Sequence, residues 1–136
     1  MPVTGKARPA VDAIMREADI RFAYLFGSRA AGGAKAGSDA DIAVMPSRSL
    51  RLLERADLAA KLVAATGFPD VDLVTLDEAG LELRGCVVQE GELIYSADER
   101  ARVGFEVRTR SEYFDFLPTL RTMERAYLAR VADRGL

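Results

Sequence analysis

Two aspartates in this sequence are separated by one residue and followed by an apolar run. Asp39 and Asp41 flank Ala40, and residues 42–45 are all hydrophobic. If this segment is a β-strand, its side chains alternate between two faces, so both carboxylates lie on the same face. Neighbouring carboxylates repel each other, and a divalent cation offsets that charge. Mg²⁺ prefers oxygen ligands and commonly links carboxylates to substrate phosphates. The spacing therefore favours a magnesium site.

A Gly-Ser pair precedes these aspartates at the end of another apolar segment. Residues 22–26 have the composition of a buried strand, and Gly27 and Ser28 follow directly. A glycine lets the backbone approach a ligand closely, and the N–H groups of a following helix start can bind phosphate. The sequence thus places a candidate phosphate-binding turn beside a candidate metal site.

A third aspartate lies in the next apolar segment. Asp72 belongs to residues 71–76, which are rich in β-branched side chains, and a carboxylate there is costly to bury without a partner or a metal. If this strand neighbours the strand of Asp39 and Asp41, the three carboxylates converge and can hold two metal ions. One ion would clamp a triphosphate, and the other would lower the pKa of an attacking hydroxyl. Asp72 would then be the leading candidate to accept its proton.

The composition leaves carboxylates as the leading acid–base and metal-binding groups. The 136 residues include no histidine and one cysteine, Cys86, so histidine chemistry, cysteine zinc clusters and intrachain disulfides are excluded. A net charge of −2 without a long basic run argues against nucleic-acid binding. No apolar run approaches the roughly 20 residues of a membrane span, and the first residues lack the apolar core of a signal peptide. We expect a single cytoplasmic domain.

The segments that must position these residues alternate between helix and strand, which predicts an α/β (α+β) fold. Strands are expected over residues 21–26, 39–45, 71–76 and 93–95, and helices over residues 9–18, 50–66, 79–89 and 98–131, with a turn or short helix at 27–34. Pro118 is expected to kink or split the last helix. That helix carries more large apolar side chains than one packing face needs; an exposed set of them would indicate a partner surface.

These motifs resemble those of the nucleotidyltransferases of the DNA polymerase β superfamily. Ten residues separate Ser28 from Asp39, which is similar to the spacing in the minimal nucleotidyltransferase (MNT) antitoxins. The resemblance covers roughly residues 21–117 and implies a polymerase-β-type core with a small mixed sheet flanked by helices. We expect this core over residues 1–97 and a C-terminal helical extension over residues 98–136, packed on the core, on a partner, or on both.

The resemblance also implies an activity and a partner. MNT antitoxins pair with HEPN ribonuclease toxins and transfer AMP from Mg-ATP to a tyrosine hydroxyl of the toxin. Ala31 stands where some relatives carry a second arginine, so this chain departs from the family pattern of phosphate contacts there. The implied site comprises Asp39, Asp41 and Asp72 as catalytic and Mg²⁺-binding residues, and Gly27, Ser28, Arg29 and Ser38 as nucleotide-binding residues.

Two other functions stay open at this point. The chain could be an antitoxin that neutralises its partner by binding alone, although its three aspartates leave no visible lesion in the site. It could also be a small-molecule nucleotidyltransferase of the aminoglycoside-modifying type. Those enzymes usually carry a further helical domain for the acceptor, for which 136 residues leave little room.

Overall fold

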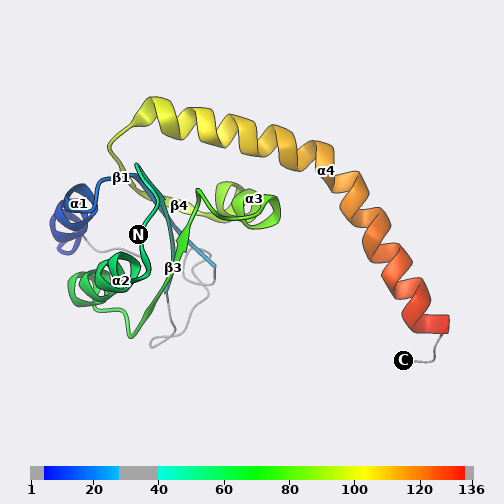
Figure 1. Cartoon of the computed structure of the whole chain (residues 1–136), viewed down its shortest axis with the longest axis horizontal. Helices are drawn as coiled ribbons and strands as arrows, with labels where there is room; N and C mark the ends of the chain where they lie inside the picture. The colour runs from blue at the N-terminus through cyan, green and yellow to red at the C-terminus, as the bar shows by residue number, and fades with distance from the viewer. Residues whose placement is uncertain (1–4, 28–39, 134–136) are drawn as a thin grey trace.

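A small mixed sheet forms the centre of the molecule (Figure 1). The computed structural model describes residues 5–27 and 40–133, and within them four strands form one sheet in the order β3-β2-β1-β4. Strand β1 runs antiparallel to β2 and β4, whereas β2 and β3 are parallel. The strands are β1 (Ile20–Phe26), β2 (Ala40–Pro46), β3 (Val71–Thr75) and β4 (Glu92–Ser96).

Helices cover both faces of this sheet (Figure 1). On one face, α1 (Arg8–Glu17) and α2 (Leu52–Thr66) enclose a core that includes Met15, Leu25, Ile42 and Leu62. On the other face, α3 (Leu81–Glu90) and α4 (Glu99–Asp133) enclose a second cluster that includes Phe22, Ala43, Val87 and Phe105. The alternation of side chains along β1 and β2 separates the two cores. The expected alternation of helix and strand is confirmed, and each predicted boundary lies within two residues of the observed one.

Helix α2 connects the two parallel strands, as a parallel pair requires. The backbone N–H of Arg51 donates to Glu54 Oε1 at 3.0 Å and so satisfies one donor at the start of this helix. The helix ends at Gly67, which has a φ of 76° and donates its N–H to Val63 O at 2.9 Å. A left-handed glycine is a common helix stop. These two ends fix where β3 begins and therefore where Asp72 lies.

Helix α4 is long and only its first part lies on the core. It spans 35 residues, contacts α3 and β1 near its start, and then projects away from the sheet (Figure 1). Pro118 lies inside the helix, which bends near its middle and does not split, so the expected kink is confirmed (Figure 1). In the described part of the chain, no helix is both long and apolar enough to cross a membrane.

Side-chain contacts with β1 and α3 hold the first part of α4 in place. The Tyr24 hydroxyl donates to Glu106 Oε2 at 2.7 Å, and Arg102 Nη1 donates to the same carboxylate at 2.6 Å. Burial of the ring and the adjacent Glu106 carboxylate raise the pKa of Tyr24. Further along, the ring of Tyr113 occupies the space that a side chain at Gly85 of α3 would need. The helix is therefore anchored to both β1 and α3.

Candidate functional site

Asp41 and Asp72 are register partners on adjacent parallel strands. Asp41 of β2 pairs with Asp72 of β3, and the Ala40 N–H donates to the Asp70 carbonyl at 3.1 Å at the start of that ladder. Because neighbouring strands lie about 4.8 Å apart, both carboxylates lie side by side on one face of the sheet. By strand alternation this is the face of Ala43, which α3 and α4 cover further along. The expected convergence of these two aspartates is confirmed.

The two carboxylates differ in their exposure to solvent. Asp41 is half-buried, whereas Asp72 is exposed. The apolar neighbours of Asp72 suggested a buried carboxylate, and that expectation is wrong. Strand β3 is an edge strand of the sheet, so it has a neighbouring strand on one side only. An exposed carboxylate beside a half-buried one leaves the pair accessible to a ligand or an acceptor group.

Gly27 borders the Asp41 carboxylate directly. Phe26, the last residue of β1, is the register partner of Asp41, and Gly27 follows with a φ of 78°. A Cβ atom at position 27 would overlap Asp41 Oδ2, so a larger residue would fill the space beside this carboxylate. Both the backbone conformation and the close approach therefore require glycine. The sequence predicted a close approach to a ligand here, but the contact with Asp41 was not predicted.

Four of the expected site residues lie outside the described residues. Ser28, Arg29, Ser38 and Asp39 belong to residues 28–39, as does most of the turn expected at 27–34. The roles of these four residues stay predictions.

The described donors fit a hard divalent cation. Asp41 and Asp72 offer carboxylate oxygens, the ligands that Mg²⁺ prefers, and two like charges on adjacent strands favour a cation between them. Asp41 Oδ2 lies in the space that a Cβ at position 27 would need, so the missing side chain accommodates this carboxylate. Within residues 5–27 and 40–133, no cluster of three or more acidic, histidine or cysteine side chains is suited to hold a metal ion. The third expected carboxylate is Asp39, which is not among those residues.

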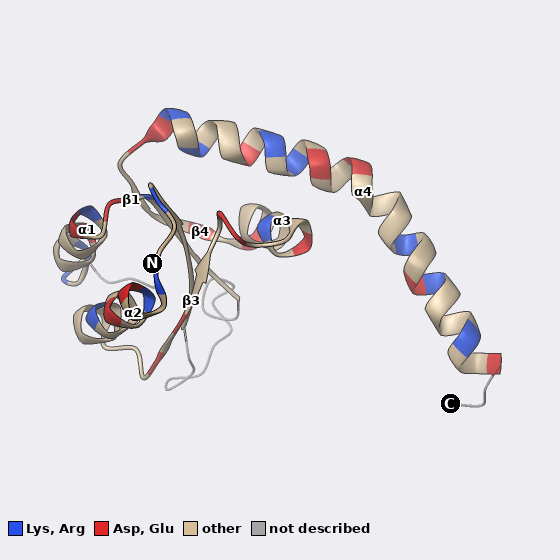
Figure 2. Cartoon of the chain, viewed as in Figure 1, with Lys and Arg blue, Asp and Glu red and all other residues tan. Residues whose placement is uncertain are grey.

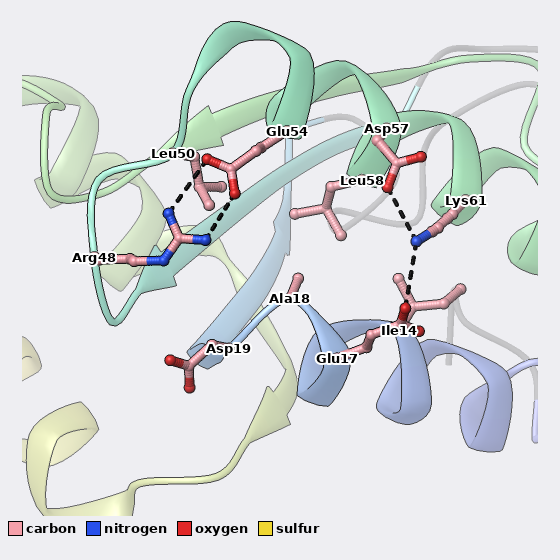
Figure 3. A pocket seen from close by; sticks show the side chains of 10 residues that line it. All are labelled: Ile14, Glu17, Ala18, Asp19, Arg48, Leu50, Glu54, Asp57, Leu58 and Lys61. Atoms are coloured by element: carbon pink, nitrogen blue, oxygen red, sulfur yellow. Dashed lines mark hydrogen bonds and ion pairs between the residues drawn. The ribbon is translucent and has the colours of Figure 1, made fainter.

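A separate cavity lies between α1 and α2, on the opposite face of the sheet (Figure 3). Its volume is about 230 Å³, and charged side chains line its rim. Arg48 Nη2 lies 2.8 Å from Glu54 Oε2, and Lys61 Nζ lies 3.0 Å from Asp57 Oδ2. Hydrogen bonds from Arg48 lower the pKa of Glu54 to about 2. These ion pairs join charged side chains on the rim to one another. The residues that line the cavity do not include Asp41 or Asp72.

Residues 10–100 match the family described as polymerase beta nucleotidyltransferase. This range includes β1, β2 and β3 and therefore the whole of the Asp41–Asp72 pair. The match confirms the fold that the sequence motifs predicted.

A curated relative shows sequence similarity over much of the same range. The protein adenylyltransferase MntA of Shewanella oneidensis is 37% identical over 94 residues, which cover 69% of this chain and 66% of that protein. The chain thus matches just under two thirds of the length of this relative.

Solved structures with similar folds extend the match. A toxin–antitoxin structure with AMP-PNP aligns with a TM-score of 0.71 and 31% identity over 92% of this chain and 98% of the matched chain. A complex of tri-AMPylated Shewanella oneidensis HEPN toxin with MNT antitoxin aligns with a TM-score of 0.67 and 29% identity, over 93% of this chain and 96% of the matched chain.

Proposed function

This chain belongs to the polymerase beta nucleotidyltransferase family, and we propose that it transfers AMP from Mg-ATP to a tyrosine hydroxyl of a HEPN-type toxin and so neutralises it. The observation that carries this proposal is the register pair of Asp41 and Asp72, with Gly27 against the Asp41 carboxylate. A paired, accessible set of carboxylates suits transfer chemistry on a phosphate chain. The relative MntA is a protein adenylyltransferase, which supports the proposed reaction.

The proposed reaction exchanges one phosphate bond for another. The tyrosine oxygen attacks the α-phosphorus of ATP, a new O–P bond forms, and the bond from the α-phosphorus to the bridging oxygen of the β-phosphate breaks, which releases pyrophosphate. The phenolic proton passes to a carboxylate, and Asp72 is suited to accept it because its side chain is exposed to an incoming acceptor.

The carboxylates also have a binding role in this proposal. Asp39, Asp41 and Asp72 would hold Mg²⁺, which when bound neutralises phosphate charge and lowers the pKa of the attacking hydroxyl. Gly27, Ser28, Arg29 and Ser38 would bind the nucleotide. The left-handed conformation of Gly27 and its contact with the Asp41 carboxylate support its part in this role, because a backbone without a side chain lets a ligand approach closely.

The projecting half of α4 is the proposed toxin-docking element. Met123, Tyr127 and Leu128 lie on it and are 59%, 60% and 62% exposed. None of the three belongs to either hydrophobic cluster of the described residues, and exposed apolar clusters mark interaction surfaces. The MNT antitoxin that was solved with its HEPN toxin aligns over 93% of this chain, more than residues 1–97 alone could supply. This supports the proposal of a core over residues 1–97 and a helical extension over residues 98–136, of which the first part packs on the core and the projecting half of α4 binds the partner.

Intact-mass spectrometry of the candidate toxin tests this proposal. The toxin, expected to be encoded beside this chain, is incubated with the chain, ATP and Mg²⁺. Wild-type protein should add whole AMP units, the Asp41→Asn variant should add none, and the Asp77→Asn variant should match wild type. Asp77 is a suitable control because it is exposed and lies in the turn after β3, beyond the Asp41–Asp72 pair. Equal transfer by Asp41→Asn and wild type would overturn the site assignment.

Two outcomes would favour the other functions. Full neutralisation of the toxin by Asp41→Asn in a growth assay would favour an antitoxin that acts by binding alone. Nucleotide transfer to an added aminoglycoside without a protein acceptor would favour a small-molecule enzyme. The accessible pair of carboxylates argues against the first of these, because a pure binding protein has no need to keep two like charges side by side.

A further inference from the structure

A second cavity, lined by three arginines, lies between the start of α4 and the sheet. Its volume is about 360 Å³, within the range of small-ligand sites. Arg21 of β1 and Arg100 and Arg108 of α4 line it, together with an apolar floor that includes Phe22, Met45 and Phe105. Phe22 pairs with Met45 in the β1–β2 ladder, whereas Phe26 pairs with Asp41. The cavity therefore lies toward the opposite end of these strands from the Asp41–Asp72 pair.

The positive charge of this cavity is not compensated. Arg21, Arg100 and Arg108 are exposed, and none of the ion pairs within residues 5–27 and 40–133 involves their guanidinium groups. No acidic residue lines the cavity. The chain as a whole has a net charge of −2, so three unpaired arginines around one hollow reverse the sign of the charge locally.

The arrangement of α4 separates these arginines from its acidic residues. Glu99 and Glu106 both pair with Arg102, and Glu112, four residues after Arg108, pairs with Arg84 of α3. Arg100 and Arg108 are separated by two helical turns and therefore lie on one stripe, on which Gly104 is the residue between them. A Cβ atom at position 104 would lie 3.2 Å from Arg108 Nη1, so the glycine gives this guanidinium room above the cavity. Figure 2 shows the basic and acidic residues along α4.

We propose that the cavity lined by Arg21, Arg100 and Arg108 is a second anion site, which binds the phosphate chain of a small polyphosphate such as pyrophosphate or a nucleotide. Arginine pairs with phosphate oxygens through two parallel hydrogen bonds. Three guanidinium groups therefore suit a phosphate chain with several negative charges better than they suit a ligand with one carboxylate. An extended nucleic acid is disfavoured, because it needs a continuous basic track on the surface. This site is independent of the proposed AMP transfer.

Calorimetry in EDTA tests the proposal with two probes, pyrophosphate and ATP. EDTA removes Mg²⁺ from the Asp41–Asp72 site, whose carboxylates then repel both probes, and the binding that is lost in the variant of the three arginines is the binding at the cavity. The variant Arg21→Gln/Arg100→Gln/Arg108→Gln removes the guanidinium groups at exposed positions, and Arg121→Gln/Arg125→Gln/Arg130→Gln removes the same charge from the projecting half of α4. Wild type and the second variant should bind pyrophosphate equally, and the first should bind it at least about tenfold more weakly.

The outcomes separate the possible ligands. Tighter binding of ATP than of pyrophosphate would identify a nucleotide site, and equal binding would identify a site for the phosphate chain alone. Two results would overturn the proposal: no binding of either probe in EDTA, or equal binding by wild type and the first variant. Binding of a single-stranded RNA octamer without binding of pyrophosphate would also overturn it. The toxin mass assay on the first variant separates the two proposals. We expect this variant to transfer AMP like wild type, because the three arginines lie away from the Asp41–Asp72 pair.

Discussion

Asp41 and Asp72 are opposite each other in the parallel ladder of β2 and β3, so two carboxylates of like charge are adjacent on one sheet face. The ladder extends to both sides of this pair, from Ala40 with Val71 to Val44 with Thr75, and therefore fixes their separation without any contribution from the carboxylates. Adjacent like charges on neighbouring strands repel each other, and a cation between them offsets that repulsion. A bound cation would therefore reduce the repulsion between Asp41 and Asp72.

Substitution of Asp72 by asparagine should separate charge repulsion from metal binding. In EDTA, Asp72→Asn should melt roughly 1–3 °C above wild type, because the like-charge pair is removed. Addition of Mg²⁺ should raise the melting temperature of wild type but not of Asp72→Asn. Differential scanning fluorimetry measures both effects. Asp77→Asn serves as the control, and a variant that keeps the full Mg²⁺ response would contradict a metal role for Asp72.

Replacement of two left-handed glycines by alanine distinguishes backbone strain from loss of the site. Gly27 and Gly67 have φ values of 78° and 76°, so alanine at either position should cost about 1–2 kcal/mol of unfolding free energy. Only at position 27 would the new Cβ collide with Asp41, since nothing lies within 4 Å of a Cβ at position 67.

Gly27→Ala should therefore lose AMP transfer by about a hundredfold or more, whereas Gly67→Ala should retain it. Urea denaturation and the toxin mass assay give the two readouts. Similar losses of transfer in the two variants would mean that general destabilisation, and not the space beside Asp41, explains the effect.

The Tyr24–Glu106 contact should make the anchoring of α4 depend on pH in the alkaline range. The pKa of folded Tyr24 is raised, while unfolded tyrosine titrates near pH 10. The contact therefore contributes its full stability below pH 10 and loses it as the pH rises toward the higher folded pKa.

Tyr24→Phe should be less stable than wild type at pH 7 by about 1–3 kcal/mol, because Glu106 loses a hydrogen-bond donor. Above pH 10 that difference should shrink. Thermal melts from pH 7 to 11 measure it, with Tyr127→Phe as an exposed control. A constant difference across this range would contradict the proposed role of the hydroxyl.

Toxin capture should depend on the apolar side chains of the projecting half of α4. The triple substitution of Met123, Tyr127 and Leu128 by serine should weaken toxin binding about tenfold or more in a pull-down titration, with ATP binding unchanged. Leu52→Ser/Leu53→Ser is the matched control, because these leucines are 81% and 82% exposed but lie on α2. Equal loss of toxin in both variants would contradict a specific docking role for α4.

The sequence determined the elements and most of the chemistry of this protein. Short apolar runs and β-branched residues located the strands. The helical period of apolar residues and the breakers Pro69 and Gly67 located α2, and the motif spacing singled out Asp41, Asp72 and Gly27. These features can be predicted from local sequence, because strand and helix formation depend on the period of apolar side chains and on the backbone preferences of nearby residues.

Only the tertiary structure decided which residues meet. The register of β2 against β3 brought Asp41 to Asp72, and no pattern within either strand specifies that pairing. The end of β1 brought Gly27 against Asp41. The exposure of Asp72 was likewise not readable from its apolar neighbours, because it depends on the place of β3 at the sheet edge.

In α4, too, the sequence predicted the helix, and the tertiary structure decided which of its side chains are buried. Its apolar residues predicted either core packing or a partner surface, and the sequence could not choose between them. Phe105 is buried and Tyr113 packs against Gly85, whereas Met123, Tyr127 and Leu128 are exposed. Likewise, Arg21 and Arg100 are 79 positions apart in the sequence and line one cavity. Burial and convergence depend on contacts between distant segments, and these are set by packing of the whole chain, not by the local sequence.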